Sequence, residues 1–161
     1  MRIILIAILV GVLSVPAYAF SPNVGNRAAN IVGRDAVTDS VVELYDYSGS
    51  WVFIDFWASW CGPCMGELPN FLAETRPWRD NGTLEVFSVS LDSERTDLRM
   101  NEVIDEFGID YPVVYDGNGW DTVQSREWGI NSIPATFLLD PQGTIIATNL
   151  RGEALGPALE F

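Results

Sequence analysis

The chain has 161 residues, enough for one domain of ordinary size, and no repeat or low-complexity tract interrupts it. Its formal net charge is −13, and all nine basic residues are arginines, because the chain has neither lysine nor histidine. A surface this acidic repels nucleic acid and anionic lipid headgroups, so neither is expected as a partner.

Residues 1–19 have the pattern of a secretory signal peptide. Arg2 precedes an apolar run from Ile3 to Val15, and small residues flank Tyr18 where a signal peptidase would read them. The run is shorter than the roughly 20 residues that cross a bilayer as a helix. Cleavage after Ala19 and export to the periplasm are therefore expected, without stable membrane insertion of the mature chain. The alternative is that the segment remains as an anchor facing the periplasm.

An extended lead is expected over residues 20–40, and one domain over 41–161. Strands are predicted at 41–44, 51–57, 83–92 and 111–116, with a hairpin over 135–149 that turns at Asp140 to Gly143. Helices are predicted at 62–79, 93–107 and 121–128, followed by one or two helical turns within 153–161. This order predicts an α/β fold with a mixed sheet and helices on both of its faces.

The only two cysteines, Cys61 and Cys64, fall where the strand of residues 51–57 meets its helix. Structural zinc needs about four cysteine or histidine ligands, and covalent haem attachment needs a histidine directly after the second cysteine. A structural disulfide closing so small a loop would stabilise little. The placement instead favours reactive thiols, because a helix N-terminus stabilises a thiolate. Neither a metal nor another cofactor is expected.

Cys61 is the predicted nucleophile, and Cys64, one helical turn further on, the residue that resolves the mixed disulfide. To do so Cys64 must lose a proton, and two carboxylates are candidates to accept it. Asp55 lies in the apolar strand that leads to the pair, and Glu67 lies three residues after Cys64 on the same helical face.

The stretch "IDFWASWCGPC" closely resembles the active-site strand and motif of the thioredoxin superfamily. Together with "SVSLD" and "SIPATFLLDPQGTI", it is similar to the exported TlpA, ResA and DsbE branch, which overlaps the redoxin and AhpC/TSA groups. The resemblance implies a thioredoxin fold, a cis peptide before Pro134, and an active-site acid at Glu67. Substrate-binding residues are expected at five positions: Trp60, Gly62, Pro63, Ile133 and Pro134. Asp55 departs from the asparagine that the branch often has there.

The resemblance further implies a thiol-disulfide oxidoreductase that acts on exported proteins. We expect a monomeric reductant of disulfides, with apocytochrome c as one possible substrate class and a membrane thiol carrier of the DsbD or CcdA type as electron donor. Three other functions stay open, one of them a holdase for unfolded exported chains that would use Trp60 and the neighbourhood of Pro134. A Cu(I) chaperone could use both thiolates with Met65, and a peroxiredoxin-like peroxidase shares the fold but needs a Pro-x-x-x-Thr-x-x-Cys motif, which the chain lacks.

Overall fold

The computed structural model describes residues 20–161, so the predicted signal peptide at 1–19 lies outside the described residues. Five strands of this part form one mixed sheet in the order β5-β4-β3-β6-β7. Their bounds are Trp51–Trp57 for β3, Leu84–Ser90 for β4, Val113–Val114 for β5, Ala135–Leu139 for β6 and Ile145–Thr148 for β7. The strand β3 pairs in parallel with β4 and antiparallel with β6, which places it at the centre of the sheet.

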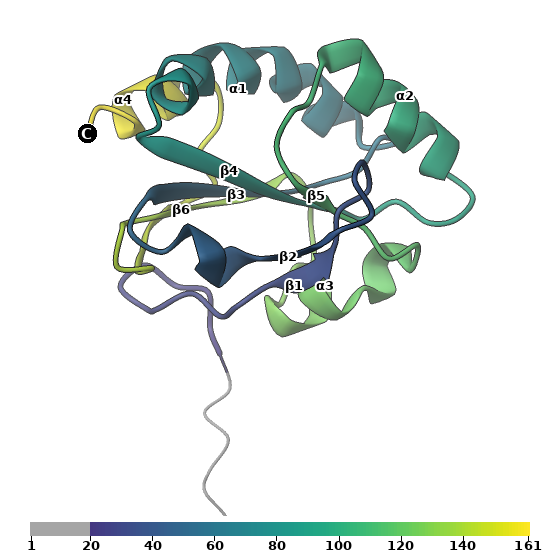
Figure 1. Cartoon of the computed structure of the whole chain (residues 1–161), viewed down its shortest axis with the longest axis horizontal. Helices are drawn as coiled ribbons and strands as arrows, with labels where there is room; N and C mark the ends of the chain where they lie inside the picture. The colour runs from purple at the N-terminus through teal and green to yellow at the C-terminus, as the bar shows by residue number, and fades with distance from the viewer. Residues whose placement is uncertain (1–19) are drawn as a thin grey trace, which may run out of the picture.

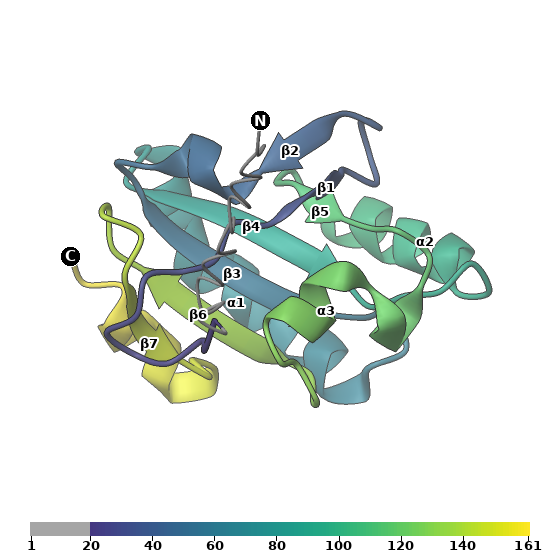
Figure 2. The same ribbon diagram turned by 90° about the horizontal axis from the view of Figure 1, so that it is seen from below.

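Helices cover both faces of this sheet, as predicted (Figure 1). Helices α1 (Gly62–Asp80), α2 (Asp97–Phe107) and α4 (Leu155–Ala158) lie on one face, and α3 (Val123–Glu127) lies on the other (Figures 1 and 2). Single 3-10 turns occur at Leu44–Tyr47, Gly119–Asp121 and Gly152–Ala154. In the described part of the chain, no helix is both long enough and apolar enough to cross a bilayer.

Helix α2 begins later than predicted. Its expected first residues, 93–96, form a turn in which the Ser93 backbone N–H donates to the Thr96 hydroxyl at 2.9 Å. The Thr96 backbone N–H donates in turn to the Ser93 carbonyl oxygen at 2.8 Å, so the helix starts at Asp97. Serine and threonine bond readily to nearby backbone, and this local turn competes with the helical pattern.

The segment before residue 41 joins the rest of the structure closely. Strand β1 (Val32–Arg34) forms an antiparallel hairpin with β2 (Val41–Glu43), so the hairpin crosses the position where the lead was predicted to end. Ile31 is fully packed in the hydrophobic core. The Asp35 carboxylate accepts a hydrogen bond from the Val113 backbone N–H at 3.0 Å, which fastens the hairpin to the edge strand β5.

Aromatic side chains fill the core on the α3 side of β3. Trp128 is completely buried and packs against Phe56 and Phe137, with ring centroids 5.8 and 5.0 Å away. Phe20 meets the same indole edge to face at 5.0 Å. Such contacts bury large apolar areas, and they hold β3 and β6 in a fixed position beneath the reactive cysteines.

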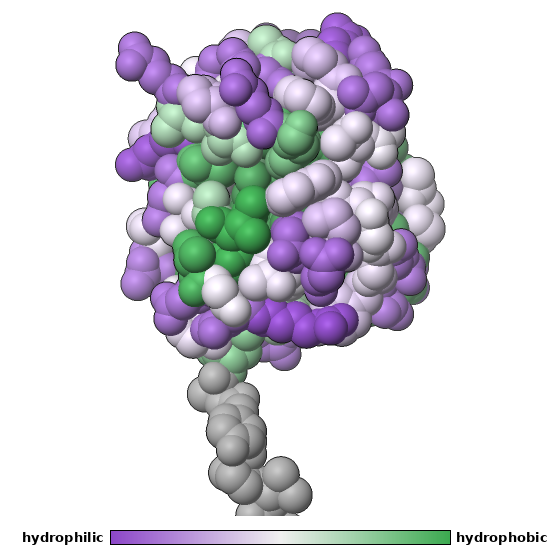
Figure 3. Space-filling model, turned by 90° about the vertical axis from the view of Figure 1, so that its left-hand side faces the viewer, coloured by the Kyte–Doolittle hydropathy of each residue, from purple (hydrophilic) through white to green (hydrophobic). Residues whose placement is uncertain are grey.

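Figure 3 shows the side of the molecule on which β7 and the C-terminus lie in Figure 2. A patch of hydrophobic side chains gathers there and is surrounded by hydrophilic ones. The strand β7 is an edge strand, and its Ile146 remains 39% exposed. This face is distinct from the carboxyl end of β3, where the cysteines lie.

Candidate active site at the start of helix α1

The cysteine pair lies at the junction of β3 and α1. The Cys61 backbone N–H donates to the Ala58 carbonyl oxygen at 3.0 Å, closing a tight turn directly after the strand. Cys61 has extended backbone geometry and is the N-cap of α1, and Pro63 occupies the first helical turn. Proline is tolerated there because its missing N–H would have had no intrahelical partner. The strand and helix thereby present both cysteines at the carboxyl edge of the sheet.

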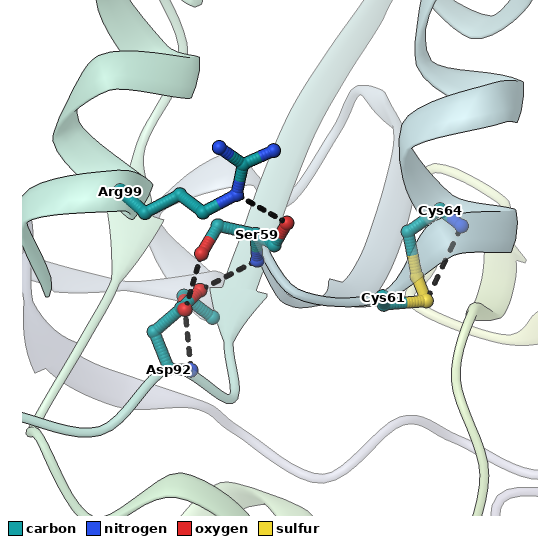
Figure 4. The surroundings of a disulfide bond; sticks show 6 residues. Ser59, Cys61, Cys64, Asp92 and Arg99 are labelled. Atoms are coloured by element: carbon teal, nitrogen blue, oxygen red, sulfur yellow. Dashed lines mark hydrogen bonds between the residues drawn. A yellow bond between two sulfur atoms is a disulfide. The ribbon is translucent and has the colours of Figure 1, made fainter. Parts of the chain in front are cut away.

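Cys61 and Cys64 form a disulfide bond in this structure (Figure 4). The Cys64 backbone N–H donates to the Cys61 sulfur at 3.2 Å, so this sulfur acts as the cap of the helix. A hydrogen bond and the positive end of the helix dipole at one sulfur both favour its anionic form. After reduction of the disulfide, this geometry therefore favours the thiolate form of Cys61.

Behind Cys64 lies a small cavity of about 20 Å³. Its lining includes both candidate carboxylates, Asp55 and Glu67, together with Cys64 and Pro134. A cavity of this size holds about one water molecule when polar groups line it. The structure thus brings together four of the predicted site residues around one cavity, through which a proton could pass between Cys64 and a carboxylate.

Asp55 has an unusual environment for a carboxyl group. Burial in the apolar strand and, second to it, the negative charge of Glu67 together raise its pKa to about 7. Its ordinary value is 3.8. A group with a pKa near neutrality can both take up and release a proton at physiological pH, which is the requirement for a general acid and base.

The side chain of Glu67 is engaged with neighbours in the described chain. Its Oε1 atom accepts hydrogen bonds from the Gly152 backbone N–H at 2.7 Å and from the Asn70 amide at 2.8 Å. Gly152 has a φ of +55°, a conformation that glycine adopts easily. Glu67 therefore ties α1 to the segment after β7, and its negative charge acts on Asp55 in the same cavity.

Of the remaining predicted residues, Pro134 lines the cavity beside Cys64, and Trp60, Gly62 and Pro63 adjoin the cysteines in the chain. The Ile133–Pro134 peptide bond is cis, as predicted. Trp60 is 45% exposed, and Gly62 and Pro63 are exposed on the first turn of α1. Ile133 is partly buried against the core. An apolar and accessible margin around a reactive sulfur is the kind of surface on which a polypeptide can dock.

Three residues near the site were missed in the sequence. Arg151 lines the cavity and is the only basic residue among the lining residues found in the described chain. Trp120 is 43% exposed and packs on Trp60 with ring centroids 6.1 Å apart. Gly152 is the third, through its bond to Glu67. All three come from segments far from the cysteines in sequence, and no local motif marks them.

A mixed five-stranded sheet with a Cys-x-x-Cys disulfide capping the helix after its central strand defines a thiol-disulfide oxidoreductase of the thioredoxin fold. The chain belongs to the AhpC/TSA family, whose sequence profile matches residues 24–148. It is 30% identical over 165 residues to the thiol-disulfide oxidoreductase ResA of Bacillus cereus, covering 99% of this chain and 91% of that protein. ResA of Bacillus subtilis is 28% identical over 76% of this chain and 64% of its own length.

Solved structures agree with this assignment. The thioredoxin domain of a thiol-disulfide oxidoreductase from Bacteroides vulgatus superposes with a TM-score of 0.75 at 28% identity, covering 86% of this chain and 96% of that one. A structure described as a putative thiol:disulfide interchange protein DsbE from Chlorobium tepidum gives a TM-score of 0.70 at 28% identity, over 86% and 93% of the two chains. The predicted fold class and the predicted enzyme class are confirmed.

Proposed function

We propose that this enzyme reduces disulfides in exported proteins through a dithiol cycle of Cys61 and Cys64. The observation that carries the proposal is the hydrogen bond from the Cys64 N–H to the Cys61 sulfur, which selects Cys61 as the thiolate. Its thiolate attacks one sulfur of the substrate disulfide, forms a mixed disulfide, and releases the other substrate sulfur as a thiolate. Cys64 then attacks Cys61, releasing the second substrate thiol.

The second step requires that Cys64 lose its proton. Asp55 is the proposed acceptor, because it lines the same small cavity and has a pKa of about 7, which burial and Glu67 raise. One water molecule in the cavity would connect the two groups. Glu67 is the proposed supporting acid, since its negative charge raises the pKa of Asp55 and so makes Asp55 a better acceptor for the Cys64 proton.

The proposed direction is reduction of substrate. The Gly62–Pro63 pair between the cysteines is that of thioredoxin, whose reduction potential is about −270 mV, whereas strong oxidants lie near −120 mV. Each turnover oxidises the Cys61–Cys64 dithiol by two electrons, so a thiol donor must reduce the disulfide again. A membrane thiol carrier of the DsbD or CcdA type is the proposed donor.

The proposed place of work is the periplasm, reached through the signal peptide predicted at residues 1–19, with the mature chain as a monomer. Apocytochrome c is the proposed substrate class, because its cysteines must be reduced before haem attachment. Trp60, Gly62, Pro63, Ile133 and Pro134 are the proposed substrate contacts; the exposure of Trp60 and of the first turn of α1 supports this.

The test is the equilibrium reduction potential of the Cys61–Cys64 pair in a dithiothreitol redox buffer, followed by tryptophan fluorescence. Trp60 lies beside Cys61 in sequence, so we expect its fluorescence to change with the redox state of the pair. We expect a value near that of thioredoxin. A value well above −200 mV would indicate an oxidant or isomerase and would end the reductant proposal.

A further inference from the structure

The turn that joins β3 to α1 decides where Cys61 lies. Ala58 and Cys61 close this turn through their backbone hydrogen bond, so Ser59 and Trp60 are its two central residues. Any tilt of Ser59 would move the exposed Trp60 side chain and the N-cap position of Cys61 together. The interactions that hold Ser59 are therefore relevant to the reaction.

Every polar group of Ser59 has a partner (Figure 4). Its backbone N–H donates to Asp92 Oδ2 at 2.8 Å, and its hydroxyl donates to Asp92 Oδ1 at 2.6 Å. Its carbonyl oxygen accepts a hydrogen bond from Arg99 Nε at 3.3 Å. Asp92 follows the end of β4 and Arg99 belongs to α2, so two separate elements hold one residue of the turn.

Burial of the Asp92 carboxylate at this position is energetically unfavourable. It is 0% exposed, and burying a carboxylate costs several kcal/mol unless strong hydrogen bonds compensate. Within residues 20–161 its oxygens have no arginine at ion-pair distance. Besides the two bonds from Ser59, Asp92 Oδ2 accepts one from the Ser90 hydroxyl at 2.8 Å. Most of its compensation thus comes from the turn that leads to Cys61.

We propose that Asp92 and Arg99 form a clamp on Ser59 that positions Cys61 for attack on the substrate disulfide. Both are positioning residues, because they act through Ser59 and contact no reacting atom. The carboxylate holds the N–H and hydroxyl from the β4 side, and the guanidinium holds the carbonyl from the α2 side. The inference rests on the proposed function only in taking Cys61 as the nucleophile, and it is independent of the direction of the reaction and of the substrate.

The clamp predicts that Asp92→Ala lowers kcat for insulin-disulfide reduction about tenfold, because Cys61 is misplaced. The alkylation of Cys61 by iodoacetamide, followed against pH in the reduced protein, should show an altered profile. Asp92→Asn should recover most of kcat, since an amide oxygen in the place of Oδ2 can still accept from the Ser59 N–H and the Ser90 hydroxyl, and the Ser59 hydroxyl can rotate to accept from the amide nitrogen. Asp116→Ala, at an exposed carboxylate nearby, is the matched control and should leave both readouts unchanged.

The kcat of Asp92→Ala is informative only when the variant folds, so Arg99→Ala gives an independent test. Arg99 lies on the exposed side of α2, and its loss removes one hydrogen bond to Ser59. We expect about a threefold lower kcat and a shifted alkylation profile, against no change for Arg95→Ala. A folded Asp92→Ala protein, or an Arg99→Ala protein, with wild-type kcat and alkylation profile would overturn the clamp. Activity that survives Cys61→Ser would instead overturn the proposed function, so the two failures are distinguishable.

Discussion

The raised pKa of Asp55 has a cost to stability that can be measured directly. The folded protein binds this proton more tightly than the unfolded chain, where the pKa is about 3.8. As pH rises from about 4 to about 7, the unfolded chain loses the proton first, so stability decreases over this range and then levels off. Replacing Asp55 by Asn removes the titration while keeping the shape of the side chain.

The size of the effect follows from the two pKa values. A shift from 3.8 to about 7 corresponds to a cost of about 4 kcal/mol at pH 8, at about 1.4 kcal/mol per pKa unit. At pH 5 only the unfolded chain is largely ionised, and the same relation gives about 1.5 kcal/mol. The stability gain of Asp55→Asn over the wild type should therefore increase by about 2.5 kcal/mol between pH 5 and pH 8.

Urea denaturation of both oxidised proteins, followed by far-ultraviolet circular dichroism at pH 5 and pH 8, measures this difference. Asp105→Asn is the control, because Asp105 lies exposed on α2. A gain that is the same at both pH values would show that Asp55 titrates normally in the folded protein. The reasoning about burial and Glu67 would then be wrong.

Three further predictions concern the cysteines, the proton acceptor and the hairpin. Cys61→Ser should abolish insulin-disulfide reduction, while Cys64→Ser should accumulate mixed disulfides that non-reducing gels reveal; equal trapping by both would contradict the assigned order. The rate of mixed-disulfide resolution should increase as pH rises through about 7, where Asp55 becomes a base. This increase of the rate with pH should be absent in Asp55→Asn. Gly33→Ala should destabilise the fold by about 1–3 kcal/mol in urea denaturation, because its new Cβ would overlap the Val114 side chain; unchanged stability would mean that the hairpin shifts freely.

The sequence by itself determined the reactive motif and the elements that carry it. The aromatic and β-branched run Trp51–Trp57 indicates a buried strand, and Gly62–Pro63 directly after Cys61 favours a helix start there, so both cysteines were predicted at a strand-to-helix junction. The turn at Asp140 to Gly143 and the glycine that ends α2 are likewise local signals. Local chemistry and hydrophobic pattern act over a few residues, which is why they could be read without a structure.

Only the tertiary structure decided which distant residues meet the cysteines. Asp92 and Arg99 lie more than thirty residues after Ser59, and both reach it because β4 runs parallel to β3 and α2 follows β4. Glu67 was predicted as an acid of the site, but its bond to Gly152 depends on how the chain returns after β7. The high pKa of Asp55 depends on burial from several elements at once. Packing determines such contacts, and packing is a property of the whole fold.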